Sequence, residues 1–400
     1  MFDFRNIDKF IPGKFERMGM LKGKRWYTNT EDDKDIYSVG LFKPQRKEFG
    51  NKKIFCANHY GEVLGYLLAI NAGVDVCKAE LAYTSQYYEN IHKVRNRAKP
   101  EEKYGCITYS KINRNQELEH GRLIVDIFMM DSYDRFNELS KGDREVDKTD
   151  NIEVVLAAIE YRVRKFYKDN NLSDELIEEK VQKNRHKAIE MMVYDCLYGN
   201  NDRHDENWAM IRNRAGTEIE LYSLYDNERV LGLYENQEFI EDALCMDKSP
   251  KYVTDSDIQE KVEKISEECL FSRMRVPGET KKRSNYKDVL EYLVKNYKDD
   301  TIEILERHLR KNTPQITEMF VSSCEGLPEP YMEFQKIMYN ARYNFAKELC
   351  ERNRTTVLKF NPIHKNQTDM GKEEREIGWD LRINHIYKTL LKKEGNSKDR

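Results

Sequence analysis

Three oxygen-bearing side chains, Asp202, Asn207 and Asp226, have types and spacings that suit phosphate chemistry. Asp202 and Asn207 lie in one short polar loop. Residues 208–222 predict an apolar strand, a turn containing Asn and Gly, and a second strand in which apolar and polar residues alternate. Because a hairpin returns the chain to its starting point, we expect Asn207 and Asp226 to lie side by side, with Asp202 one loop away.

The chemistry of a nucleotide's phosphates explains these residue types. Mg²⁺ takes oxygen ligands and keeps several waters, so the Asp226 carboxylate and the Asn207 amide oxygen could hold it beside a triphosphate. Asp202 could orient an attacking hydroxyl and accept its proton. The competing interpretation is a solvated loop with this content by chance, since Asp-x-x-x-x-Asn alone matches many sequences. The surrounding helix, loop, hairpin and aspartate favour the site.

The residues around this loop resemble one branch of the kinases. An Asp-x-x-x-x-Asn loop, followed after two strands by another Asp, is the base and metal arrangement of protein kinases. The run Gly-Asn-x-Asp-Arg-His-x-x-Asn-Trp at residues 199–208 is similar to the catalytic loop of the HipA-like kinases, and its Asp-Arg-His core also to that of phosphoinositide kinases. The Leu-Tyr-Asp run at residues 224–226 favours the HipA-like kinases. In phosphoinositide kinases this aspartate usually begins an Asp-Phe-Gly motif, whereas Asn227 and Glu228 follow Asp226 in this sequence.

The resemblance implies an α+β, two-lobed protein-kinase-like fold of the HipA type, with a small β-rich N-lobe and a large, mainly helical C-lobe. It implies that Asp202 is the base, that Asn207 and Asp226 are Mg²⁺ ligands, and that Lys43 binds phosphate. Family members use ATP and Mg²⁺ to phosphorylate serine or threonine on proteins, and many autophosphorylate. Some are growth-arrest toxins held by a DNA-binding antitoxin, so an antitoxin is a further candidate partner.

The first lobe must position Lys43 and a carboxylate partner. Residues 36–43 predict a strand that Pro44 ends, and Lys43 there could hold the α- and β-phosphates as a point charge. Its Leu-Phe-Lys-Pro run resembles the nucleotide-binding strand of the family; the alternative is an exposed lysine at a strand end. Residues 61–72 predict a helix in which Glu62 either pairs with Lys43 or is a favourable charge near the helix N-terminus.

Two more strands are expected in the first lobe, at residues 76–83 and 104–109. The second should lead into the segment that joins the lobes. Its backbone amide and carbonyl would then read the adenine edge near Ile107 and Tyr109. Residues 1–23 contain no Gly-x-Gly-x-x-Gly motif, so a phosphate-covering loop and a plain leading segment remain alternative interpretations.

Helices should give the loop a rigid base. Apolar positions in residues 152–166 and 188–197 predict two core helices, and the second ends just before the loop. Ser173 predicts the N-cap of a separate short helix. His204 either touches the γ-phosphate, as the resemblance implies, or serves as a structural hydrogen-bonding group; we place it with Asp202 among the candidate catalytic residues.

We expect an N-lobe over residues 1–110, a C-lobe over 111–360 that contains the loop and hairpin, and a polar tail over 361–400. Charged residues make up 35% and hydrophobic residues 39%, and the formal net charge of −3 gives no argument for direct nucleic-acid binding. No apolar run approaches the length of a membrane span. Without a signal-peptide pattern or paired cysteines, we expect a cytoplasmic protein, or an effector secreted without such a peptide.

Three functions from different classes fit these observations. The first is a serine/threonine protein kinase. The second is a phosphoinositide or small-molecule kinase, which the loop permits, although no basic stripe for an anionic head group lies near it. The third is a non-catalytic nucleotide-binding regulator, which the complete set of acidic residues disfavours. Lys43 comes too early for the long leading segment of the larger HipA proteins, so the chain resembles the short, stand-alone kind more.

Overall fold

The computed structural model describes residues 4–16, 24–29, 39–45, 48–49, 52–53, 56–87, 101–113, 115–143, 145–246, 253–268, 273–278 and 284–354. The predicted polar tail, 361–400, lies outside the described residues, as does part of the leading segment in which a phosphate-covering loop was considered.

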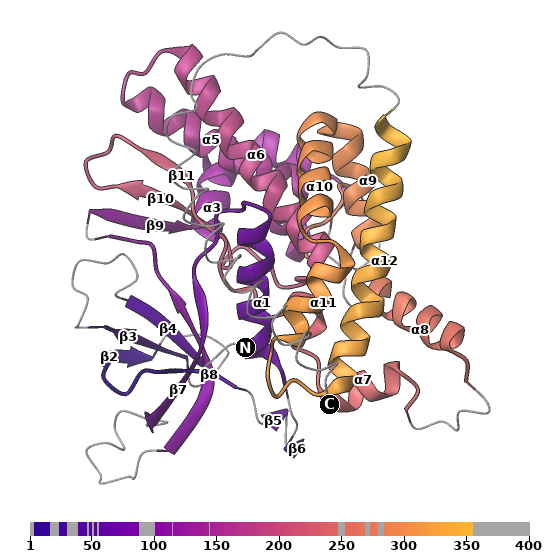
Figure 1. The fold of residues 1–400 in the computed structure, drawn as a ribbon. Helices are drawn as coiled ribbons and strands as arrows, with labels where there is room; N and C mark the ends of the chain where they lie inside the picture. The colour runs from indigo at the N-terminus through magenta and orange to yellow at the C-terminus, as the bar shows by residue number, and fades with distance from the viewer. Residues whose placement is uncertain are drawn as a thin grey trace. The chain divides into compact units, whose positions relative to one another are not determined.

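A six-stranded sheet forms the first lobe (Figure 1). Its strands, in spatial order, are β1 (Arg5–Asn6), β7 (Ala79–Tyr87), β8 (Glu101–Tyr109), β4 (Val39–Pro44), β3 (Arg25–Thr28) and β2 (Ile11–Glu16). All neighbours are antiparallel except the short β1–β7 pair. A separate small hairpin joins β5 (Glu48–Phe49) and β6 (Lys52–Lys53). The expected lysine strand is β4, and it lies near the middle of the sheet.

Helix α1 (Asn58–Asn71) is buried on nearly every side. It packs on β7 and β8 on one side and on helical elements of the second lobe on the other, and Figure 1 shows it between the strands and the orange helices. Most of its residues are apolar, as suits a helix in an interior, and here it forms the layer between the sheet and the helical lobe. The helix begins three residues before the predicted start at Gly61.

A second sheet holds the predicted hairpin. It has the order β11 (Ile219–Leu221), β10 (Ala209–Asn213), β9 (Gln116–His120). Met210 pairs with Leu221 in antiparallel register, which confirms the hairpin between Asn207 and Asp226. Strand β9 pairs with the other edge of β10 and brings the chain from the first lobe to this sheet.

Two long helices, α5 (Ile152–Asp169) and α6 (Asp174–Tyr198), pack against each other above this sheet. The Ser173 side chain caps α6 by accepting a hydrogen bond from the Leu176 amide. The expectation of a separate short helix after Ser173 was wrong: residues 174–198 form one helix of 25 residues, because they contain no Gly or Pro and bury one continuous face. Gly199 ends it at φ 72°, a left-handed conformation that favours glycine.

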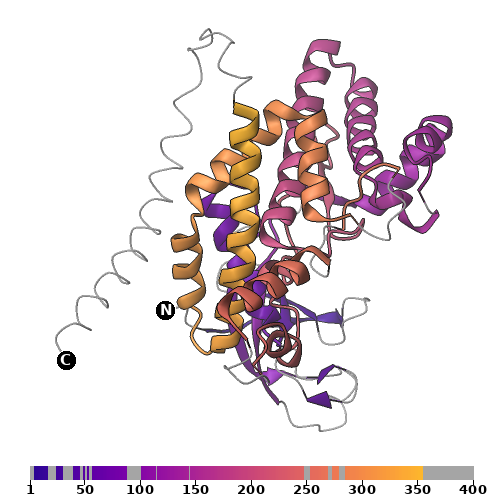
Figure 2. The same cartoon turned by 90° about the vertical axis from the view of Figure 1, so that its right-hand side faces the viewer.

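The second lobe is otherwise helical, as the resemblance implied. Its remaining elements are α3 (Gly121–Asp131), α4 (Tyr133–Leu139), η1 (Glu145–Asp150), η2 (Val230–Gly232), α7 (Gln237–Ala243), α8 (Asp255–Glu268), α9 (Tyr286–Asn296), α10 (Lys298–Lys311), α11 (Pro314–Ser322) and α12 (Glu329–Arg354). Helices α9 and α10 pack on α6, and Figure 2 shows α12 along the outer side of this layer.

The α+β architecture, with a small β-rich lobe and a larger helical lobe, confirms the expected fold class. The seven cysteines that the structure describes are buried, and no disulfide joins any of them. None of the helices among the described residues is both long enough and apolar enough to cross a membrane.

Candidate active site

Lys43 on β4 lies between two carboxylates. Its Nζ is 2.8 Å from Glu62 Oε2 and 2.6 Å from Asp226 Oδ1, and the residue is only 2% exposed. Thr108 Oγ1 donates to the other Glu62 oxygen at 3.1 Å. Helix α1 begins at Asn58, so Glu62 lies beyond its first turn. The expected Lys43–Glu62 pair is present, and the alternatives of an exposed lysine and of a helix N-terminal charge are wrong.

Electrostatics keep this lysine charged in spite of its burial. Desolvation by burial lowers the pKa of Lys43, but the Asp226 and Glu62 carboxylates together raise it well above its ordinary value. A buried ammonium that loses its partners costs several kcal/mol. The three side chains therefore form one interdependent group between β4, α1 and the segment after the hairpin.

The Arg203 guanidinium joins the two ends of the hairpin. Its Nη1 donates to the backbone oxygens of Asn207, at 2.8 Å, and of Tyr225, at 2.6 Å. Its Nε and Nη2 form a bidentate ion pair with Asp195 of α6, at 3.0 and 3.1 Å. One buried cation thus fixes the backbone at Asn207 and immediately before Asp226, which explains how the two candidate metal ligands are held in register.

Sequence reasoning missed Asp195. This residue is a buried carboxylate in an otherwise apolar helical stripe, and Asn200 Nδ2 also donates to it at 3.0 Å. Burial raises the pKa of Asp195, and Arg203 opposes that shift. Asp195 lies directly beside the apolar residues Cys196 and Leu197 just before the loop, and that position was the signal available in the sequence, because a buried charge needs a partner.

The loop of residues 202–207 is held by hydrogen bonds among its own residues. The amides of His204 and Asn207 donate to the carbonyls of Asp202 and His204, each at 2.8 Å. Asn207 Nδ2 donates to the Asp202 carbonyl at 2.8 Å, which orients the amide and leaves its oxygen as the atom for a cation. The His204 Nδ1 accepts from the Glu206 amide at 3.2 Å, a contact within the loop itself.

Asp202 faces an arginine that sequence reasoning did not single out. Arg229 Nε is 3.2 Å from Asp202 Oδ2, and the guanidinium lies 4.3 Å from the centroid of the Tyr234 ring. Burial raises the pKa of Asp202, while Arg229 and His204 lower it. The candidate base is therefore a half-buried carboxylate whose proton affinity is set by competition between desolvation and this arginine.

The expected adenine contact at Ile107 and Tyr109 is not supported by the structure. Both residues lie within β8, which is paired on both edges, with β4 and β7. Ile107 is opposite Phe42 on one side and Glu80 on the other. The backbone of a central strand is used by its neighbours, so it cannot also read a base edge.

The chain leaves this sheet just after the expected position. Ser110 N donates to Val39 O at 2.8 Å, and Lys111 N donates to the Tyr222 hydroxyl at 2.8 Å. These contacts tie the start of the interlobe connection to both lobes. Strand β8 was predicted over residues 104–109; its end at Tyr109 is confirmed, and it begins three residues earlier than predicted, at Glu101.

The donors at Asn207 and Asp226 fit Mg²⁺. Both are oxygen donors, the Asn207 amide is oriented by its own hydrogen bond, and the Asp226 carboxylate already binds a cation, the Lys43 ammonium. Asp226 has a φ of 58°, an unusual conformation for a non-glycine residue that marks a constrained site. Among the residues that the structure describes, no three His, Cys, Asp or Glu side chains are arranged to hold a metal.

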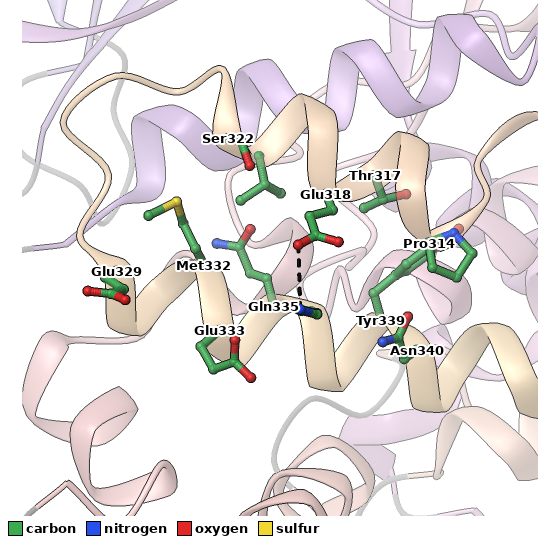
Figure 3. Close-up of a pocket in the computed structure, with 12 residues that line it drawn as sticks. Pro314, Thr317, Glu318, Ser322, Glu329, Met332, Glu333, Gln335, Tyr339 and Asn340 are labelled. Atoms are coloured by element: carbon green, nitrogen blue, oxygen red, sulfur yellow. Dashed lines mark ion pairs between the residues drawn. The ribbon is translucent and has the colours of Figure 1, made fainter. Parts of the chain in front are cut away.

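A pocket at another place in the fold contains none of these residues. It lies between α11 and α12 and is lined by side chains that include Glu318, Gln335 and Tyr339, as Figure 3 shows. An ion pair between Glu318 and Lys336 crosses it.

The small β-rich lobe, the larger helical lobe and the Lys43 group agree with the two-lobed, kinase-like fold that the resemblance implied. A solved structure of the Helicobacter pylori proinflammatory kinase CtkA aligns with a TM-score of 0.60 and 16% identity, covering 90% of this chain and 100% of that one. HipA of Shewanella oneidensis MR-1, solved with HipB and operator DNA, aligns at TM-score 0.41 and 11% identity over 79% of this chain and 60% of that one. The second likeness is too distant to carry an argument. No protein-family model and no curated protein sequence matches this chain.

Proposed function

We propose that this chain is an ATP- and Mg²⁺-dependent phosphotransferase of the HipA-like type that phosphorylates serine or threonine on proteins. The observation that carries the proposal is the buried Lys43 ammonium between Glu62 and Asp226, within a kinase fold. A lysine that is paired with a helix glutamate, close to an aspartate that can hold Mg²⁺, is the arrangement that positions nucleotide phosphates in kinases.

Each side chain then has one task. Lys43 stays with Glu62 and binds the α- and β-phosphates of the ATP substrate through its ammonium. Asn207 and Asp226 would hold Mg²⁺, which neutralises charge on the phosphates. Asp202 orients the acceptor hydroxyl and takes its proton, and its raised pKa makes it a better proton acceptor than an exposed aspartate. Catalysis in such a site comes mostly from positioning and electrostatics.

We prefer a protein acceptor to a lipid or small alcohol because the loop resembles that of the HipA-like kinases more than that of the phosphoinositide kinases. We keep His204 as a candidate catalytic residue of the loop. An antitoxin partner and autophosphorylation stay predictions from the same resemblance. A cytoplasmic location, or secretion as an effector without a signal peptide, stays a prediction from the sequence.

The test uses radiolabelled ATP with the full chain, Mg²⁺ and a general protein acceptor such as casein. We expect Asp202→Asn, which keeps the shape of the side chain, to lower labelling of casein and of the chain itself by at least about 100-fold. Asp134→Asn, the same change at an exposed position of α4, should label as the wild type does. Equal labelling by the wild type and Asp202→Asn would end the assignment, and labelling of phosphoinositide vesicles alone would favour the second class of substrate.

A further inference from the structure

Gln335 of α12 is a buried residue whose side-chain amide is unpaired. The residue is 1% exposed, and neither its Nε2 nor its Oε1 has a hydrogen-bond partner among the residues that the structure describes. An interior amide that leaves both groups unsatisfied costs free energy, so its presence needs an explanation. Gln335 belongs to the lining of the pocket between α11 and α12, and Figure 3 shows its side chain extending from α12 toward α11.

The pocket has room for one side chain. Its volume is about 230 Å³, which is below the range of about 300–1,000 Å³ for pockets that bind drug-sized ligands. Its buried lining includes Tyr339, whose ring stacks on that of Tyr198 with 5.7 Å between the ring centroids. Because Tyr198 is the last residue of α6, this part of the lining is anchored in the core of the helical lobe.

The exposed part of the lining is acidic. It contains Glu318, Glu329 and Glu333, whereas Lys336 is the cationic residue among the lining residues described. Lys336 Nζ lies 3.5 Å from Glu318 Oε1, and the two side chains are 46% and 52% exposed. An ion pair at this exposure contributes little to stability, so it opens at little cost. The pair lies between the two helices beside Gln335 in Figure 3, and its opening gives an entering group access to the buried amide.

The donors and acceptors of these side chains define the chemistry of an occupant. The carboxylates and the Gln335 Oε1 accept hydrogen bonds from a cation, but a cationic side chain has no acceptor for the Gln335 Nε2, which only donates. A peptide segment with a basic side chain supplies both, since its backbone carbonyls accept. Arginine suits the place better than lysine, because the planar fork of its guanidinium donates to a carboxylate and an amide oxygen at the same time.

We propose that the pocket between α11 and α12 binds an arginine in a basic peptide segment of a protein partner. The guanidinium takes the place of the Lys336 ammonium at Glu318 and donates to Gln335 Oε1, while a carbonyl of the segment accepts from Gln335 Nε2. Binding here does not depend on the proposed phosphotransfer, because the pocket contains no residue of the Lys43 group. The competing explanation is an enclosed water that satisfies the Gln335 amide, with no ligand at all.

The experiment begins with an array of short peptides that carry a central arginine and no acidic residue, probed with the full chain in the absence of nucleotide. The peptide that binds most strongly is labelled with fluorescein and titrated with the chain, and fluorescence anisotropy measures binding. We expect saturable binding that weakens at least about 10-fold when citrulline, which is neutral and has nearly the same shape, replaces the arginine. No saturable binding by any peptide, or equal binding of the citrulline form, would overturn the inference.

Three variants locate the binding on the chain. Glu318→Gln should weaken peptide binding at least about 10-fold, whereas Lys336→Met, which removes the competing ammonium, should tighten it. Gln335→Met puts an apolar group of similar length in place of the amide. It should weaken peptide binding without lowering the melting temperature, because two unpaired polar groups are removed. Glu348→Gln, the same charge change as Glu318→Gln at an exposed position of α12, should match the wild type.

Peptide affinity that is unchanged in Glu318→Gln, or in a folded Gln335→Met chain, would refute this pocket as the site. A lower melting temperature in that folded chain, with unchanged affinity, would show that Gln335 is held by water and is structural. If Gln335→Met does not fold, Glu318→Gln and Lys336→Met decide, since both change exposed side chains.

Agmatine, which has the guanidinium but no peptide carbonyl, separates a free small cation from a protein segment. It should displace the labelled peptide only at concentrations at least about 10-fold above those of the unlabelled peptide. Equal displacement by the two would assign the pocket to a small cation and contradict the protein partner. Failure of peptide binding leaves the proposed phosphotransfer standing, because the labelling of casein by Asp202→Asn and the wild type tests that function separately.

Discussion

The Arg203 guanidinium forms a buried bidentate ion pair with the Asp195 carboxylate, with N–O distances of 3.0 and 3.1 Å. The same guanidinium also binds the backbone oxygens of Asn207 and Tyr225. Helix α6 is thereby connected, through one cation, to the loop and to the segment that carries Asp226. The geometry of the candidate site depends on a pair that contacts neither nucleotide nor acceptor in the proposed reaction.

Asp195→Asn should therefore destabilise the fold. The asparagine keeps the shape of the side chain but leaves the buried Arg203 charge without its counter-ion, which costs about 3–5 kcal/mol for pairs of this kind. Urea unfolding, followed by circular dichroism, measures the change. Asp134→Asn at the exposed start of α4 should change the free energy of unfolding by no more than about 0.5 kcal/mol, and a comparably small loss in Asp195→Asn would contradict the organising role of the pair.

Removal of Arg229 should change the pH dependence of phosphotransfer. Burial raises the pKa of Asp202 and Arg229 lowers it, so the pKa rises further in Arg229→Met. Asp202 acts as a base only when it is deprotonated, and activity is lost as pH falls through its pKa. The acidic limb of the kcat profile should therefore move to higher pH in the variant. Arg229→Lys, which keeps the charge, should move it less, and identical acidic limbs in wild type and Arg229→Met would argue against Asp202 as the base.

Lys43→Met should remove most of the nucleotide affinity. The variant takes away the ammonium that Glu62 and Asp226 hold at 2.8 and 2.6 Å and leaves both carboxylates without it. We expect binding of a fluorescent ATP analogue, measured by fluorescence titration, to weaken at least 10-fold. Lys141→Met, at an exposed position after α4, is the matched control. Unchanged affinity in a folded Lys43→Met chain would place the nucleotide elsewhere.

The sequence predicted the parts of this site that local pattern determines. The loop and the hairpin are contiguous, so Asn207 and Asp226 could be expected to meet, and the Arg203 contacts with the backbone at both ends agree. Lys43 and Glu62 were predicted as a pair from the strand and helix that carry them, together with the resemblance. The structure has that pair at 2.8 Å.

The remaining parts depend on contacts between distant segments, which periodicity does not report. Lys24 meets Asp226 and Glu228 across about two hundred residues of chain, and no local pattern marks Lys24 or Glu228. The adenine contact was misplaced to Ile107 and Tyr109 because a strand's pairing on both edges becomes visible only in the folded sheet. The continuation of α6 through residues 174–198 was missed because its charged first half hides the buried face.

The measurement that tests the account most directly is a crystal structure of the chain with Mg²⁺ and a non-hydrolysable ATP analogue. The account predicts the triphosphate between the lobes, with the Lys43 ammonium moved from Asp226 toward the α- and β-phosphates while it keeps Glu62. It also predicts Asp226 and the Asn207 amide oxygen on the metal, with Asp202 facing the γ-phosphate. A nucleotide bound away from Lys43, for example in the pocket between α11 and α12, or an Asp226 carboxylate that stays on Lys43 with no metal beside it, would contradict the account.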